Sequence, residues 1–534
     1  MTGSSPSQAA APATPVLPPT TVGGLLRSAA NRSPAFPALR CPDPDGGATR
    51  ELDYAGLLAE SERCARRLLT LFEPGDRIAV WADNRVEWVV LQFGAALAGL
   101  VLVTVNPAFT PAEAKYVLAQ SRACACFAVR KYRGAPLADH TRDLQPELPA
   151  LARVLELDDW EAFLAGPEFE GALPDVSPEQ PVMIQYTSGT TGLPKGAVLL
   201  HGRLTHDAEQ VALRAELAVN RAWLVPVPLF HTGGSVCGVL GAVSRRNTVL
   251  LMGAWSAEVA LRLVEEHRIA ITNIVPTMLL AMLEHPSATE RDVSSLQCVL
   301  AGGAVVSAEL VRRVESELGA TVYIIFGQTE CGPVATMTHP GDTPEDKQNT
   351  VGTALQGFEV KIVDPETGAT VPRGVAGEFC ARGTTMAGYF ENDAATEAAF
   401  DGDGWLHTGD VCAMDERGYL RVEGRLRDMI IRGGENIYPR IIEEALLAHP
   451  AVADVAVVGL PDRRMGEVVG AVVVPRAAGP FDKDEVARHL RARLAGFNVP
   501  ERWMRADELP RTATGKIQKF LLREQWQSGA VDEL

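Results

Sequence analysis

The segment Tyr186-Thr-Ser-Gly-Thr-Thr-Gly-Leu-Pro-Lys-Gly196 contains the residue types that bind a polyphosphate. Three glycines allow the backbone to approach a ligand closely and to present N–H groups to it: Gly189, Gly192 and Gly196. Hydroxyl donors and one ammonium group come from Thr187, Ser188, Thr190, Thr191 and Lys195. Pro194 occupies the place where a Walker A loop has its second glycine, so this is not a Walker A loop. A polar surface turn is the alternative, and the length of the string argues against it.

Six further segments follow, and most contain a polar or charged group suited to a nucleotide. They are Ala301-Gly-Gly-Ala304, Phe326-Gly-Gln-Thr-Glu330, Gly404-Trp-Leu-His-Thr-Gly-Asp410, Gly424-Arg-Leu-Arg-Asp-Met-Ile430, Gly433-Gly-Glu-Asn-Ile-Tyr-Pro439 and Pro510-Arg-Thr-Ala-Thr-Gly-Lys516. Taken alone, Asp410 is typical of a local hydrogen-bonding turn, Arg425 of a surface ion pair and Lys516 of an exposed loop. Together and in this order, the segments resemble the adenylate-forming superfamily. That superfamily comprises acyl- and aryl-CoA synthetases, peptide-synthetase adenylation domains and firefly luciferase.

The resemblance implies a first reaction in which a carboxylic acid attacks the α-phosphate of ATP and expels pyrophosphate. Charge builds up on phosphate oxygens, so positioning and electrostatic stabilisation do most of the work. By resemblance, residues 187–196 hold the β- and γ-phosphates, Thr329 donates to the α-phosphate, and Glu330 binds Mg²⁺ as a hard oxygen ligand. Lys516 brings a positive charge between the substrate carboxylate and the α-phosphate, and we expect it to carry the adenylation step.

The resemblance also implies how the rest of the nucleotide and coenzyme A are held. Phe326 offers a stacking surface for adenine where the family often has tyrosine. Gly302, Gly303 and Ala304 line the seam between adenine and the acyl chain. Asp410 accepts the ribose hydroxyls, and Arg425 donates to the ribose. In the second half-reaction the small domain turns about Arg427, so that Gly433 and Gly434 replace Lys516 and form part of the pantetheine tunnel.

The acyl group is expected beside Pro228-Leu-Phe-His-Thr-Gly-Gly-Ser-Val236. Peptide-synthetase adenylation domains have an aspartate after the phenylalanine, which pairs with the amino group of their substrate. Here that position is His231, so a buried ammonium would lack its partner and amino acids are poor candidates. His231 either gates the carboxylate entrance or is a hydrogen-bonded wall residue. Small residues in this segment favour a medium- or long-chain fatty acid, or a bulky alicyclic or aromatic acid.

The elements that must position these groups alternate between helical and β-rich stretches. We expect a helix over 54–71, strands over 77–81, 270–275 and 321–326, and α/β layers with largely parallel sheets. The C-terminal part predicts a small α+β unit with helices over 441–448 and 484–494 and strands over 452–458 and 470–475. The expected organisation is a disordered leader (1–20), a large multi-subdomain N-terminal domain of packed α/β layers (21–426) and a small mobile C-terminal domain (427–534).

Composition restricts the compartment and the partners. Lys plus Arg is 50 and Asp plus Glu is 67, giving a net charge of −17, which argues against nucleic-acid binding. The nine cysteines form no CxxC pair and indicate reduced thiols in the cytoplasm. The longest apolar run, Trp88 to Val105, contains two glycines and predicts a buried helix followed by a strand, so no integral membrane segment is expected.

The sequence therefore predicts an AMP-forming acyl-CoA synthetase that uses ATP, Mg²⁺ and coenzyme A. Two alternatives stay open: a ligase that loads a carrier protein, and one that performs a single half-reaction with a partner ligase. A homodimer is also allowed. A non-catalytic nucleotide-binding or scaffold protein is disfavoured because Glu330, Asp410, Arg425 and Lys516 are all present.

Overall fold

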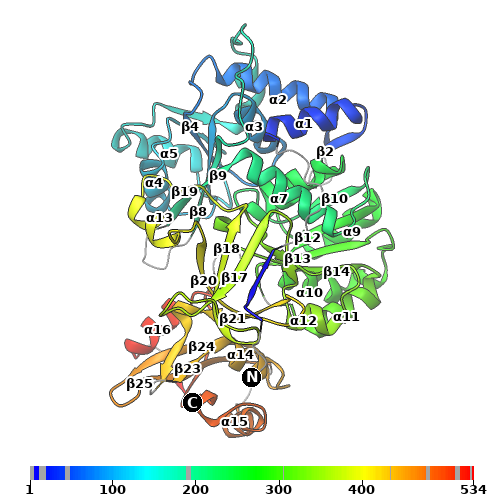
Figure 1. The fold of residues 1–534 in the computed structure, drawn as a ribbon. Helices are drawn as coiled ribbons and strands as arrows, with labels where there is room; N and C mark the ends of the chain where they lie inside the picture. The colour runs from blue at the N-terminus through cyan, green and yellow to red at the C-terminus, as the bar shows by residue number, and fades with distance from the viewer. Residues whose placement is uncertain are drawn as a thin grey trace. The chain divides into compact units, whose positions relative to one another are not determined.

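The computed structural model describes residues 5–10, 20–42, 49–187, 194–304, 306–432, 435–476, 481–511, 517–529 and 532–534. The chain divides into two compact units (Figure 1). The larger unit comprises residues 8–360 and 380–407, and the smaller comprises 1–7, 361–379 and 408–534. The smaller unit thus contains residues 1–7, 361–379 and 408–426 in addition to the residues 427–534 expected from the sequence.

One sheet of the larger unit has seven strands. The polyphosphate segment connects two of them. Its order is β19 (Gly388–Tyr389), β9 (Lys195–Leu200), β8 (Pro181–Thr187), β5 (Val101–Val105), β4 (Arg77–Trp81), β6 (Ala125–Ala128) and β7 (Arg153–Glu156). The strands from β8 to β7 are parallel to their neighbours, whereas β9 and β19 are antiparallel. Strands of the parallel core such as β5 are buried along their whole length, as expected for a sheet covered on both faces.

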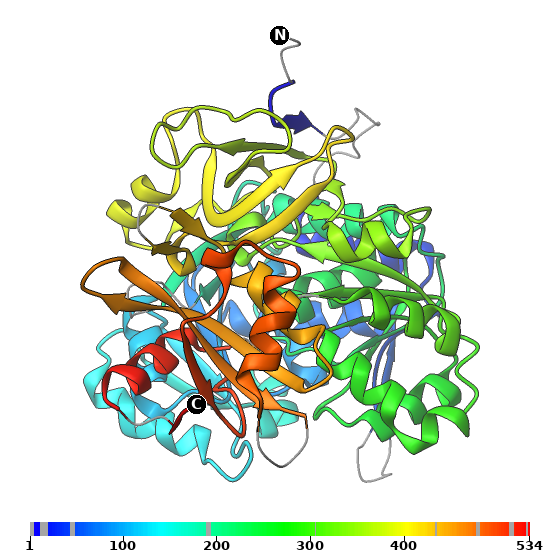
Figure 2. The ribbon, with the colours of Figure 1, turned by 90° about the horizontal axis from the view of Figure 1, so that it is seen from below.

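The second sheet of the larger unit has nine strands. Its order is β16 (Thr353–Ala354), β15 (Thr336–Met337), β14 (Thr321–Phe326), β13 (Cys298–Gly302), β12 (Ile269–Ile274), β10 (Ala222–Val225), β11 (Thr248–Leu251), β2 (Pro37–Cys41) and β3 (Arg50–Asp53). It is parallel from β14 to β2 and antiparallel at both edges. Figure 2 shows green helices along the outer side of this sheet.

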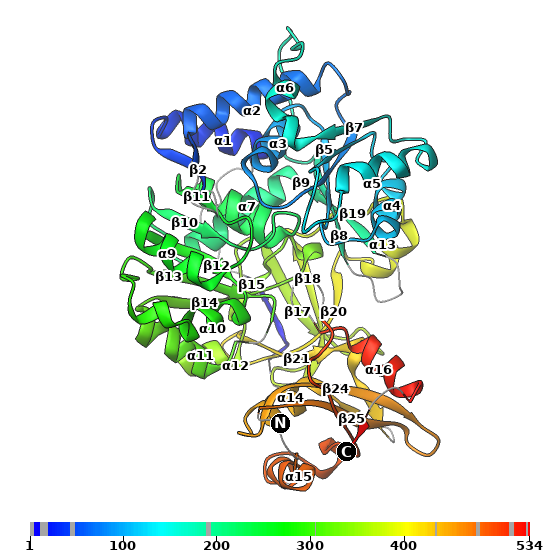
Figure 3. The ribbon, with the colours of Figure 1, turned by 180° about the vertical axis from the view of Figure 1, so that it is seen from behind.

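Helices fill the space between the sheets and cover their outer faces. They are α1 (Val22–Arg32), α2 (Tyr54–Leu68), α3 (Val86–Leu97), α4 (Pro111–Gln120), α5 (Leu137–Leu144), α6 (Trp160–Leu164), α7 (His201–Arg214), α8 (Gly241–Ser244), α9 (Ala257–His267), α10 (Pro276–Glu284), α11 (Ala308–Arg313), α12 (Pro344–Asn349) and α13 (Asp393–Ala399). Helix α7 lies between the two sheets, with α4 and α5 outside one sheet and α9 and α11 outside the other (Figures 1 and 3). A π-helix, Gly233–Leu240, precedes α8.

A five-stranded sheet has the order β1 (Gln8–Ala10), β17 (Phe358–Val363), β18 (Ala376–Gly383), β20 (Leu406–Met414) and β21 (Leu420–Arg425). Strand β1 differs from the expected disordered leader. Ser7 N–H donates to the carbonyl oxygen of Val371 at 2.9 Å, and Ile362 N–H donates to that of Ser7 at 2.9 Å. These backbone bonds order residues 5–10, while residues 11–19 lie outside the described part of the chain.

The C-terminal part of the smaller unit is α+β, as predicted. Its elements are β22 (Ile430–Arg432), β23 (Glu435–Ile437), α14 (Pro439–Leu447), β24 (Val452–Asp462), β25 (Gly466–Pro475), α15 (Lys483–Arg491), β26 (Arg502–Arg505), α16 (Lys519–Gln527) and β27 (Asp532–Glu533). Strands β24 and β25 pair antiparallel. Val455 and Val457 pack into one hydrophobic cluster while Ala456 and Val458 pack into another, so alternate residues of β24 build a core on each face.

The long apolar run forms α3 and then β5, as expected. None of the helices in the described part of the chain combines the length and the apolar character that crossing a bilayer requires.

Candidate functional site

Two segments that are 143 residues apart in sequence meet at Glu330. Thr187, the last residue of β8, donates its hydroxyl to Glu330 Oε1 at 2.8 Å, and the hydroxyl of Tyr389 donates to the same oxygen at 3.0 Å. Lys195 lies 4.9 Å over the ring of Tyr389. Thr187 at the start of the polyphosphate segment therefore contacts Glu330 directly, whereas Lys195 near its end is linked to Glu330 through Tyr389.

The local fold explains why Glu330 points there. Strand β14 ends at Phe326, and the chain turns back through a 3₁₀ turn at Thr329–Cys331. The turn is closed by a hydrogen bond from Ala335 N–H to the Phe326 carbonyl oxygen, 2.9 Å long. Met386 N–H donates to the Glu330 carbonyl oxygen at 2.8 Å, so the backbone of Glu330 is held as well as its side chain. Thr329 and Glu330 are both buried, with 6% and 7% of their surfaces exposed.

The central residues of the polyphosphate segment lie outside the described residues. They are Ser188, Gly189, Thr190, Thr191 and Gly192. The described ends show how the segment is anchored. Strands β8 and β9 pair antiparallel with Thr187 opposite Lys195, and Phe390 N–H donates to the Gly196 carbonyl oxygen at 2.8 Å.

Gly302 is the last residue of β13 and lies beside the end of β14, and Gly303 and Ala304 follow it. Gly302 is paired with Ile325, and a β-carbon on Gly302 would lie 2.7 Å from the Ile325 carbonyl oxygen. Only glycine permits this approach, and Gly303 has φ of +79°. The structure therefore brings these glycines next to the strand that ends at Phe326.

His231 is fixed by the backbone of its own segment. Its Nδ1 accepts the N–H of Gly233 at 3.0 Å, which in a neutral ring places the proton on Nε2. The following π-helix is a rare conformation that is often found at functional sites. A β-carbon on Gly234 would lie 2.3 Å from the Pro228 carbonyl oxygen, so glycine is required where the π-helix begins.

Buried amides position the segment around His231. Asn84 donates to the carbonyl oxygens of Val227 (3.0 Å) and Met252 (3.1 Å) and accepts the N–H of Leu229 at 2.8 Å. Asn273 donates to the Gly233 carbonyl oxygen at 2.7 Å. The main chain on both sides of His231 is therefore held by side chains from distant elements.

In the smaller unit, Asp410 and Arg425 lie opposite each other on β20 and β21. Arg425 Nε is 2.9 Å from Asp410 Oδ1, and Asp410 is 4% exposed. Gly409 N–H donates to Glu378 Oε1 at 3.0 Å, which holds the backbone of β20 just before Asp410. The structure thus pairs these two residues with each other. Gly433, Gly434 and Lys516 lie outside the described residues.

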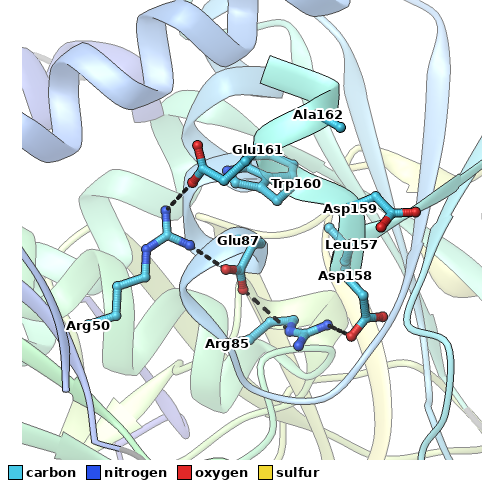
Figure 4. Close-up of a pocket in the computed structure, with 9 residues that line it drawn as sticks. All are labelled: Arg50, Arg85, Glu87, Leu157, Asp158, Asp159, Trp160, Glu161 and Ala162. Atoms are coloured by element: carbon cyan, nitrogen blue, oxygen red, sulfur yellow. Dashed lines mark hydrogen bonds and ion pairs between the residues drawn. The ribbon is translucent and has the colours of Figure 1, made fainter. Parts of the chain in front are cut away.

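A hollow of about 390 Å³ in the larger unit is lined by Arg50, Arg85, Glu87, Leu157, Asp158, Asp159, Trp160, Glu161 and Ala162 (Figure 4). Arg50 pairs with Glu87 and Glu161, and Arg85 pairs with Glu87 and Asp158. Each arginine is thus paired with two carboxylates, and none of the lining residues belongs to the predicted site. We interpret the hollow as an ion-paired junction between segments.

The sequence did not reveal Tyr389, Asn84 or Asn273 as parts of the site. Tyr389 reaches Glu330 only because β19 pairs with β9, and the two asparagines act mainly on backbone carbonyl oxygens. Contacts of this kind depend on topology and leave no local residue pattern.

The oxygen donors around Glu330 fit a hard cation. Glu330 is a buried carboxylate with two hydroxyl donors, and no positively charged side chain pairs with it in the described part of the chain. A buried carboxylate without a positive partner is unfavourable, so the arrangement is suited to a divalent ion bound with phosphate oxygens.

Comparison with known families agrees with this geometry. Residues 26–390 match the model of the AMP-binding enzyme family, and residues 441–516 match that of the AMP-binding enzyme C-terminal domain. The chain belongs to the AMP-binding enzymes. As such it is an acid–thiol ligase of the acyl-CoA synthetase type, for which ATP, a carboxylic acid and coenzyme A are the substrates.

Individual relatives align with this AMP-binding enzyme over most of its length. YngI of Bacillus subtilis (strain 168), named as a candidate acyl-CoA synthetase, is 37% identical over 95% of this chain and 97% of its own. A 3-[(3aS,4S,7aS)-7a-methyl-1,5-dioxo-octahydro-1H-inden-4-yl]propanoyl:CoA ligase of Mycobacterium tuberculosis is 35% identical over 88% and 96%. The crystal structure of ATP-bound MatB from Rhodopseudomonas palustris matches with a TM-score of 0.86 and 28% identity over 95% and 99%.

Proposed function

We propose that this enzyme activates a medium- or long-chain fatty acid, or a bulky alicyclic or aromatic acid, as an acyl-adenylate and transfers the acyl group to coenzyme A. The observation that carries the proposal is the contact of Thr187 and Tyr389 with Glu330, with Lys195 over the ring of Tyr389. Hydroxyl groups, a carboxylate and a nearby positive charge are the groups that a nucleotide polyphosphate and its metal require, and this supports the proposal.

In this proposal each described residue has one task. Glu330 would hold Mg²⁺ as a hard carboxylate ligand, with the hydroxyls of Thr187 and Tyr389 orienting the carboxylate. Lys195 and the residues that follow Thr187 hold the β- and γ-phosphates, and Thr329 donates to the α-phosphate. Phe326 stacks on adenine above Gly302 and Gly303, with Ala304 beside the acyl group.

The ribose is assigned to Asp410, which accepts its hydroxyls, and to Arg425, which forms an ion pair with Asp410. Lys516 serves the first half-reaction, and Gly433 and Gly434 serve the second. The small domain begins at residue 427 in functional terms, with Arg427 as the hinge.

The substrate class follows from the segment around His231. With histidine at position 231, this segment offers a substrate ammonium no carboxylate. Apart from His231, the segment from Pro228 to Val236 contains only small, apolar or hydroxyl-bearing residues, and this favours an apolar acyl group. Support also comes from the relative that is named for a bicyclic propanoyl substrate.

A panel of acids supplied with ATP, Mg²⁺ and coenzyme A tests the proposal through AMP release and thioester formation. Octanoate, palmitate, a bicyclic alkanoate, benzoate and phenylalanine separate the classes. We expect turnover with an acid from the first four and none with phenylalanine. A phenylalanine-dependent pyrophosphate exchange would contradict the substrate class. Adenylation without thioester formation would instead point to a carrier protein or a partner ligase.

A further inference from the structure

Helix α7 presents polar side chains to the two loops that hold Glu330. Arg203 donates to the carbonyl oxygens of Thr385 (2.6 Å) and Met386 (2.9 Å). One turn later, Asp207 Oδ2 accepts the N–H of Val334 at 3.1 Å. Residues four apart lie on the same face of a helix, so α7 contacts both loops from one side.

Val334 lies on the returning limb of the Glu330 loop, which is the stretch of chain that leads from the 3₁₀ turn to β15. The outgoing limb continues from β14 and is held by that strand. The returning limb leads into β15, which pairs with β14, and it is also held by the bond from Ala335 N–H to the Phe326 carbonyl oxygen and, at Val334, by Asp207. Val334 is 3% exposed, so water cannot replace Asp207 as the hydrogen-bond acceptor of its N–H.

Asp207 is an unusual residue for the interior of a protein. It is 1% exposed, and its Oδ1 has no hydrogen-bond partner among the described residues. Burial raises the pKa of this carboxyl well above its usual range, and the Val334 N–H only partly opposes the effect. The titratable neighbour in the described structure is the buried thiol of Cys237 on the π-helix, so no cation offsets the burial. An apolar residue of similar size would avoid this cost.

We infer that Asp207 is a positioning residue for adenylate formation: through Val334 it fixes the loop that bears Glu330 and thereby sets the affinity of the enzyme for Mg²⁺. The inference rests on the proposed role of Glu330 as the metal ligand. Asp207 lies on α7, outside the phosphate-binding segments, and acts on Glu330 by holding the loop that bears it.

The test compares the Mg²⁺ dependence of pyrophosphate exchange in variants at position 207. Asp207→Leu removes the acceptor at similar volume, and we expect the half-saturating Mg²⁺ concentration to rise about tenfold. Asp207→Asn keeps an oxygen for Val334 and should stay within about twofold of the parent. Hydrogen exchange at the Val334 amide should accelerate in the leucine variant only. Asp207→Ala takes its place if Asp207→Leu does not fold.

Thr205→Val is the matched control on the same helix. Thr205 is buried and donates to the Thr20 carbonyl oxygen at 2.8 Å, away from the Glu330 loop. It should lower thermal stability without changing the Mg²⁺ dependence. An unchanged Mg²⁺ dependence in Asp207→Leu, or an equal shift in Thr205→Val, would overturn the inference.

Glu330→Gln separates failure of this inference from failure of the proposed function. If Glu330→Gln leaves the Mg²⁺ dependence unchanged, the metal assignment itself is wrong, and the inference falls with it. If Glu330→Gln shifts the dependence and Asp207→Leu does not, only the role of Asp207 is wrong.

Discussion

At the scale of single residues, the interior of the larger unit contains two carboxylates that are held differently. Glu330 accepts two hydroxyl groups and is the proposed ligand of a cation, whereas Asp207 accepts one backbone N–H and is buried more completely. Burial raises the pKa of Asp207 well above its usual range. Its surroundings therefore favour the neutral, protonated form of Asp207.

Asp207→Asn should change how stability depends on pH. The folded protein keeps the proton of Asp207 to a higher pH than the unfolded chain does, because burial raises the pKa of that carboxyl. The stability contributed by the neutral acid is complete below the unfolded pKa, and it is lost as pH rises through the folded pKa. Asparagine does not titrate. The melting temperature of the variant relative to the parent should therefore increase from about pH 5 to about pH 8. A constant difference across that range would show that Asp207 is ionised in the fold.

At the scale of elements, the strands were predicted more accurately than the contacts between them. Arg77–Trp81 and Thr321–Phe326 form strands with the expected bounds, because short β-branched and apolar runs in a buried sheet admit few alternatives. The helix expected over 54–71 ends at Leu68, since helix ends are set by local backbone bonds that residue patterns do not specify.

The π-helix and the contacts of α7 could not be predicted from sequence. The π-helix begins in a glycine-containing segment whose composition permits several backbone forms. Asp207 is 127 residues from Val334 in sequence, and its Oδ2 accepts a main-chain N–H. A main-chain donor leaves no mark in the pattern of side chains. The phosphate and metal residues could be proposed from sequence because their order in the chain resembles a family, whereas the supporting residues depend on the packing of distant elements.

Gly234→Ala tests the start of the π-helix. Its β-carbon would lie 2.3 Å from the Pro228 carbonyl oxygen, so the segment around His231 must move, at a cost of about 1–3 kcal/mol. We expect a lower melting temperature and a raised KM for the acid in pyrophosphate exchange. Gly253→Ala is the control, because its β-carbon meets only the Asn84 carbonyl oxygen at 3.7 Å. Equal acid KM values in the two variants would show that the π-helix start does not shape the acyl site.

At the scale of the whole molecule, the two half-reactions must be separable because each requires its own set of groups. Gly434→Leu tests the second set. A leucine side chain in the proposed pantetheine tunnel would obstruct coenzyme A and leave the adenylation site intact. We expect pyrophosphate exchange close to that of the parent and thioester formation reduced about a hundredfold. Normal coenzyme A turnover in this variant would place the tunnel elsewhere.

Lys516→Ala tests the first set. The proposed ammonium lies between the substrate carboxylate and the α-phosphate, where two negative groups would otherwise repel each other. Its loss should reduce pyrophosphate exchange about a hundred- to a thousandfold, whereas thioester formation from a synthetic acyl-adenylate and coenzyme A should persist. Lys519→Ala is the matched control, because Lys519 pairs with Glu443 at 2.7 Å within the small unit and has no proposed catalytic role. If Lys516→Ala lost both activities equally, one arrangement of the chain would have to serve both half-reactions, and Arg427 would have no role as a hinge.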